Sequence, residues 1–77
     1  MNVERLVTMA NDISHFFVAE AGPDGAPEQI AAHLKKFWDP RMRSAIAAHA
    51  EAGGHGLSAP ALAAAKLLAA APATAQR

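Results

Sequence analysis

The stretch FWDPRMR, residues 37–43, decides how this chain folds. A proline disfavours helical backbone at the residue before it, and an aspartate followed by proline is a typical helix start, with the aspartate as cap. Just upstream, Lys35 and Lys36 suit the carboxyl end of a helix, where positive charge is favoured. The stretch therefore predicts a corner at which one helix ends near Trp38 and the next begins at Pro40.

The same seven residues also concentrate side chains that are typical of binding hot spots. Tryptophan and arginine are enriched there, and Arg41 and Arg43, at the positive end of the next helix, could clamp a carboxylate or a phosphate. A second interpretation stays open, in which Phe37 and Trp38 close the core and the arginines pair locally with carboxylates such as Glu28, Asp39 or Glu51. We predict that Trp38, Arg41 and Arg43 bind a partner.

Upstream of the corner, larger apolar residues recur at three- and four-residue spacing, as on one face of a helix. This pattern predicts a first helix over residues 3–20, with Asn2 as its cap. Glycines and prolines then predict a turn over residues 22–27. Pro27 suits the first position of a second helix, which runs to about Trp38.

Downstream of the corner, the third helix is expected to end at Gly53 and Gly54, because glycine tolerates the left-handed conformation that closes helices. Leu57 before Ser58, with Leu62 one turn later, predicts a serine-capped fourth helix reaching about Ala71. The fold class is therefore all-α, a small bundle of three to four short helices. We expect one domain over residues 1–71 and a flexible tail over residues 72–77.

Only a small core is available to this bundle. The chain has 77 residues, and its 52% hydrophobic content is mostly alanine, with 5% aromatics. Such small domains commonly depend on a disulfide, a metal or a partner. The residues expected in the core are Leu6, Val7, Ile13, Phe16, Phe17, Ile30, Leu34, Phe37, Trp38, Met42, Ile46, Leu57, Leu62, Leu67 and Leu68.

Charge and cysteine content narrow the function. Seven basic and seven acidic residues give a formal net charge of zero, so no overall field attracts nucleic acid. Cysteine is absent, which removes disulfides, thiolate ligands and cysteine nucleophiles. Neither a signal peptide nor an apolar run long enough to cross a bilayer is evident. A cytoplasmic, non-catalytic binding protein is expected.

Other candidate sites have simpler interpretations. His15, His33, His49 and His55 have no i, i+4 pair and no placed carboxylate, so we expect ordinary histidines and no metal site. The glycine-rich residues 53–56 lack the lysine and the strand of a phosphate-binding loop. Ser58 has no paired base and is expected to cap a helix. No catalytic, cofactor-binding or metal-ligating residue is predicted.

Several strings in the chain resemble one family. They are RLV (5–7), MANDI (9–13), FF (16–17), IA and HL (30–31 and 33–34), FWDPRMR (37–43), His49, and GG and GL (53–54 and 56–57). Together they are similar to the delta subunit of the bacterial NAD-dependent, molybdenum-containing formate dehydrogenases. The strings around residues 9–13 and 37–43 are the most specific.

The resemblance implies a role in a cytoplasmic complex that oxidises formate to carbon dioxide and reduces NAD. In that family the alpha subunit holds bis-molybdopterin guanine dinucleotide and iron–sulfur clusters, and the beta and gamma subunits carry flavin and further clusters. The delta subunit has no redox centre and is associated with assembly, cofactor insertion and stability. The implied partner of this chain is the alpha subunit.

Two alternatives remain open at the level of sequence. The second and third helices could form the helix-turn-helix of a small nucleic-acid-binding regulator, although the junction is shorter than the usual turn. The chain could also bind the molybdenum cofactor itself, with its arginines gripping the pyrophosphate.

Overall fold

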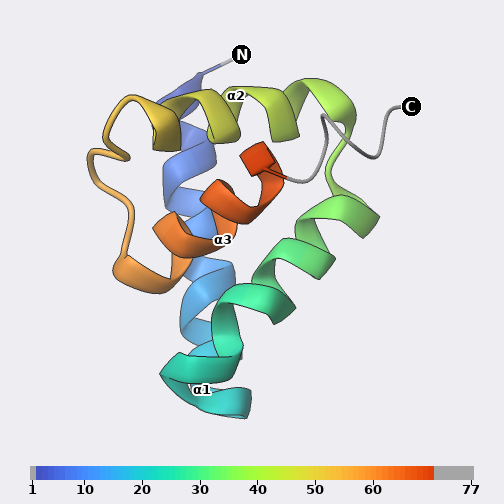
Figure 1. Ribbon diagram of the computed structural model, residues 1–77, viewed down its shortest axis with the longest axis vertical. Coiled ribbons are helices and arrows are strands. Elements are labelled where there is room, and N and C mark those ends of the chain that lie inside the picture. Colours follow the sequence, from blue (N-terminus) through green and yellow to red (C-terminus); the bar gives the residue numbers. More distant parts are fainter. Residues whose placement is uncertain (1, 71–77) are drawn as a thin grey trace.

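The computed structural model describes residues 2–70, which form three helices and no strand: α1 (Val3–Phe37), α2 (Pro40–Glu51) and α3 (Ala59–Ala70). α1 is bent into a V, α2 crosses the open end of the V, and α3 lies within it (Figure 1). The predicted all-α class is confirmed. The tail predicted over residues 72–77 lies outside the described residues.

A single glycine makes the bend in α1. Gly22 has φ 79° and ψ 166°, whereas the residues on both sides are helical. The predicted loop over residues 22–27 is therefore wrong, because the helix resumes at Pro23 rather than Pro27. Proline is tolerated in the first turn of a helix, where amides have no intrahelical acceptor. Gly22 thus replaces the whole expected loop, and α1 has two legs, before and after it.

Alanine dominates the core. The buried hydrophobic residues are Leu6, Ala10, Ala26, Ile30, Ala31, Leu34, Trp38, Ile46, Ala47, Ala50, Ala61, Ala64, Ala65 and Leu68. α3 packs against both α1 and α2, and its buried side chains are three alanines and one leucine. Because alanine side chains are short, the helices can approach closely without large side chains between them.

Three residues predicted for the core are instead exposed: Phe16 by 59%, Phe37 by 68% and Leu67 by 41%. The prediction for Trp38 is correct, since it is 6% exposed. Phe37 and Trp38 are adjacent, and successive side chains at a helix end point in different directions. Only one of the two can enter the core, and the tryptophan does so.

Hydrogen bonds from the first leg of α1 hold the loop between α2 and α3. The side-chain amide of Asn11 donates to the Gly56 carbonyl at 2.9 Å, and its oxygen accepts from the Ser58 amide at 2.9 Å. The Ser58 hydroxyl donates to the buried Ser14 hydroxyl at 3.1 Å and accepts from the Ala61 amide at 3.3 Å. Ser58 therefore caps α3, as predicted, and also joins the loop to α1.

The end of α2 confirms the predicted glycine stop. Gly53 and Gly54 both have positive φ, and the Gly54 amide donates to the His49 carbonyl at 2.8 Å. This bond satisfies one of the free carbonyls at the helix end. A Cβ at Gly54 would overlap the side chain of Leu62, so both the backbone conformation and the space require glycine there.

This packing predicts opposite effects for two glycine-to-alanine substitutions. Gly54→Ala should lower the free energy of unfolding by at least about 2 kcal/mol, because it combines a left-handed alanine with a clash. Gly25→Ala should be neutral or stabilising, by up to about 1 kcal/mol, because Gly25 lies inside a helix where alanine is preferred. Urea unfolding of both variants checks this. A destabilising Gly25→Ala would contradict the helix that starts at Pro23.

Candidate functional site

The corner predicted from residues 37–43 is present in the structure. α1 ends at Phe37, and the Trp38 amide donates to the Leu34 carbonyl at 2.9 Å. Asp39 has extended backbone, and its carboxylate accepts from the Met42 amide at 2.9 Å, with Pro40 as the first residue of α2. The chain therefore changes direction within two residues, and Asp39 is the predicted cap.

The three predicted binding residues occupy different environments. Trp38 is buried in the core, whereas Arg41 is exposed on the first turn of α2. Arg43 is half-buried, and its Nη1 donates to the Lys35 carbonyl at the end of α1 over a long 3.4 Å. Its buried Nε has no hydrogen-bond partner. Arg43 thus helps to close α1, and of the three only Arg41 has an exposed side chain. Partner binding by all three stays a prediction.

The structure also reveals a surface that sequence reasoning missed. Phe16, Phe17, His33 and Phe37 form a chain of ring contacts that we call the aromatic ladder. Ring centroids are 5.1 Å apart for Phe16 and Phe17, 5.7 Å for Phe17 and His33, and 4.7 Å for His33 and Phe37. The first two contacts are edge-to-face, a favoured arrangement. The ladder joins the two legs of α1 across their inner angle.

Two signals in the sequence point to the ladder. Phe16 and Phe17 are adjacent, so a helix that buries one turns the other toward solvent. His33 and Phe37 are four residues apart, which places them on one face of the second leg. All three phenylalanines had been assigned to the core, and the structure makes Phe17 half-buried and the other two exposed.

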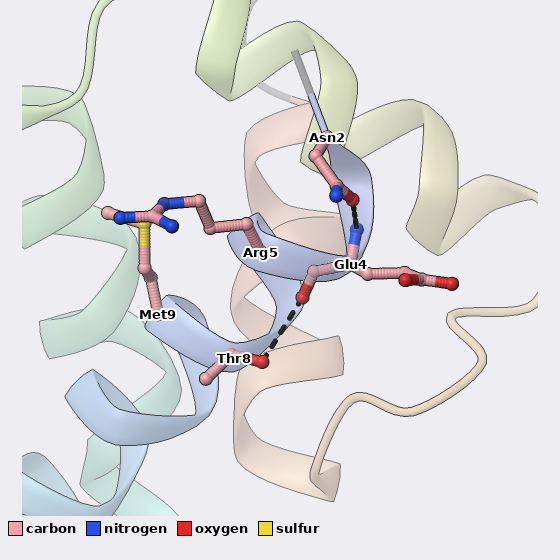
Figure 2. Close-up of a pocket in the computed structure, with 5 residues that line it drawn as sticks. All are labelled: Asn2, Glu4, Arg5, Thr8 and Met9. Carbon is pink, nitrogen blue, oxygen red and sulfur yellow. Dashed lines mark hydrogen bonds between the residues drawn. The ribbon is translucent and has the colours of Figure 1, made fainter.

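An open hollow lies beside the first turns of α1. It is lined by Asn2, Glu4, Arg5, Thr8 and Met9. Figure 2 shows that the Arg5 side chain reaches over the Met9 side chain, while Asn2 and Thr8 bond to the helix backbone. The Asn2 oxygen accepts from the Glu4 amide at 2.8 Å, and the Thr8 hydroxyl donates to the Glu4 carbonyl at 3.2 Å. These polar groups therefore serve the start of the helix, and Asn2 is the predicted cap.

The histidines are dispersed over the fold. Nε2 of His49 lies 2.7 Å from the His55 carbonyl oxygen and ties α2 to its following loop, while His33 belongs to the ladder. Over residues 2–70, no group of three or more His, Cys, Asp or Glu side chains is placed to hold a metal ion. Within the same range, no helix combines the length and hydropathy needed to span a membrane.

The fold and these surfaces define a small all-α protein that presents aromatic rings beside a helix corner. A family model described as the NADH-dependent formate dehydrogenase delta subunit FdsD matches residues 5–65. Because the match covers most of the 77 residues, the chain belongs to the formate dehydrogenase delta subunit family, as the resemblance indicated. No curated protein and no solved structure gives a significant match.

The strings that carry the resemblance have visible structural work. Asn11, in the string MANDI, bonds to both Gly56 and Ser58, so it links two of the family-like strings across the fold. Asp39, in FWDPRMR, caps α2. By contrast, the exposed Phe37 and Arg41 make no comparable contribution to the fold, which leaves them available for binding.

The corner separates residues that serve the fold from residues that serve binding. Asp39→Ala should lower the free energy of unfolding by about 1 kcal/mol, because α2 loses its cap. Arg41→Ala should change it by less than about 0.5 kcal/mol, because the side chain is exposed. Thermal or urea unfolding of the two variants measures the difference. Equal destabilisation would show that Arg41 is a structural residue.

Proposed function

We propose that this chain acts as the accessory delta subunit of a cytoplasmic NAD-dependent molybdenum formate dehydrogenase. In this role it binds the large alpha subunit, within a complex that also has beta and gamma subunits. It supports assembly, insertion of bis-molybdopterin guanine dinucleotide and stability of the complex, and it does not catalyse the reaction itself. The observation that carries the proposal is the family match over residues 5–65.

Composition and surface chemistry support a binding role. The chain contains no cysteine, so it offers no thiolate to an iron–sulfur cluster. Its largest exposed side chains are aromatic or cationic and lie around the end of α1 and the start of α2: Phe37, Lys36 and Arg41. Aromatic and arginine side chains are enriched at protein interfaces.

Within this proposal the three corner residues have distinct roles. Arg41 contacts the alpha subunit directly, as a donor to a carboxylate or to carbonyl oxygens. Trp38 and Arg43 hold the corner in shape, Trp38 from inside the core and Arg43 through the Lys35 carbonyl, and they contact the partner with whatever edge the corner leaves open.

Deleting the gene tests the proposed function. We expect the remaining complex to contain less molybdenum per alpha subunit, to oxidise formate more slowly and to dissociate more readily. Metal analysis, formate-dependent NAD reduction and native mass measurements report these three effects, and re-expression of the intact chain should reverse them. A deletion strain that yields fully loaded, fully active and equally stable enzyme would contradict the proposal.

Binding by the corner can be tested separately. Arg41→Ala should weaken binding to the complex about tenfold, the loss of one moderate hot spot of about 1.4 kcal/mol. Lys66→Ala removes an exposed cation from α3 and is the matched control, with no expected loss. Trp38→Phe tests the core position more gently than alanine would. Unchanged co-purification of variants at Trp38, Arg41 and Arg43 would show that the corner is not the binding site.

A further inference from the structure

Large aromatic side chains lie outside this protein while alanines fill its interior. The chain has three phenylalanines, and two of them, Phe16 and Phe37, are 59% and 68% exposed. Eight of the fourteen buried hydrophobic residues are alanines, which contribute far less burial free energy per side chain. The helices therefore pack without these two phenylalanines, whose apolar surface remains available for a partner.

The ladder holds these exposed rings in fixed positions. Phe17 and His33 are half-buried, and each packs against one of the exposed phenylalanines. The ladder spans both legs of α1, so the bend at Gly22 fixes the distance between Phe16 and Phe37. A partner that binds them loses little side-chain entropy, which is the condition under which aromatic anchors contribute most to affinity.

Charges of opposite sign flank the two ends of the ladder. Lys36 and Arg41 are exposed near Phe37, and the nearby Asp39 carboxylate is engaged as a helix cap. Exposed Asp12 and Glu20 lie four residues on either side of Phe16, on the same face of the first leg. An anionic membrane or a nucleic acid would be repelled at the Phe16 end. A protein surface can instead match both signs around an apolar centre.

We propose that the aromatic ladder docks into an apolar groove of the alpha subunit, with Phe16 and Phe37 as the anchors. The groove carries carboxylates where Lys36 and Arg41 meet it and cationic side chains opposite Asp12 and Glu20. This inference rests on the proposed function and names the surface that performs it. The ladder is continuous with the corner, because Phe37 directly precedes Trp38.

A larger subunit fits this surface better than a second copy of the chain does. At 59% and 68% exposure, the two phenylalanines offer roughly 250 Å² together, whereas a stable interface covers about 800 Å² on each partner. The described chain is a small body of 33 × 26 × 21 Å. Two such bodies meet over a limited area, whereas a groove in a large subunit can cover the ladder and the corner together.

The test measures binding to enzyme purified from the deletion strain. Phe16→Ser/Phe37→Ser should weaken the binding of the full chain at least 30-fold, and Phe37→Ser alone about tenfold, with unchanged thermal unfolding. Leu67→Ser is the matched control, because Leu67 is also a large exposed hydrophobic residue but lies on α3 outside the ladder. It should bind within twofold of the unsubstituted chain.

Each other outcome overturns a defined part of the account. If the unsubstituted chain binds and the double variant binds equally well, the ladder is not the docking surface, while the proposed function stands. If the unsubstituted chain does not bind, the proposed function is wrong and the ladder loses its stated partner. The same proposal is overturned if the double substitution only converts a dimer into a monomer in sedimentation, or only abolishes binding to a single-stranded oligonucleotide.

Discussion

The rest of the structure depends on the close packing of α3 against the other two helices through alanine side chains. Short side chains let three helices meet around a very small interior, but each contributes little burial free energy. The relative positions of the helices therefore depend on specific local devices. Gly22 reverses α1 in one residue, Asn11 and Ser14 bond to the loop before α3, and Gly54 leaves room for Leu62. Each device is a position where another residue would change how the helices meet.

The same constraint connects the fold to its function. An interior filled by alanine accepts one tryptophan but does not bury Phe16 or Phe37. Exposed aromatic surface is costly in water and favourable in an interface, so the chain reaches its most stable arrangement when a partner covers the ladder. This is the economy expected of a subunit: a domain of 8.0 kDa without cysteine gains from another chain what its own core does not supply.

Sequence reasoning succeeded where the determinants are local. Asn2, Asp39 and Ser58 cap helices as predicted, and Gly53 and Gly54 end α2, because capping chemistry acts within three or four residues. It failed where the outcome depends on packing between distant segments. Residues 22–27 contain two glycines and two prolines, and only tertiary contact decides that one glycine makes the turn. Likewise, periodicity marks Phe16, Phe17 and Phe37 as apolar but does not say which of them the alanine core can accept. The ladder was missed for the same reason, since its four rings come from two legs that meet only after the bend.

The central claim is that the aromatic ladder is exposed in the free chain and covered in the complex. Hydroxyl-radical footprinting read by mass spectrometry measures this residue by residue, with the free chain compared against the assembled formate dehydrogenase. The account predicts that Phe16 and Phe37 are oxidised in the free chain and protected severalfold in the complex, while oxidation of Leu67 is unchanged. Equal oxidation of Phe16 and Phe37 in both samples would contradict it.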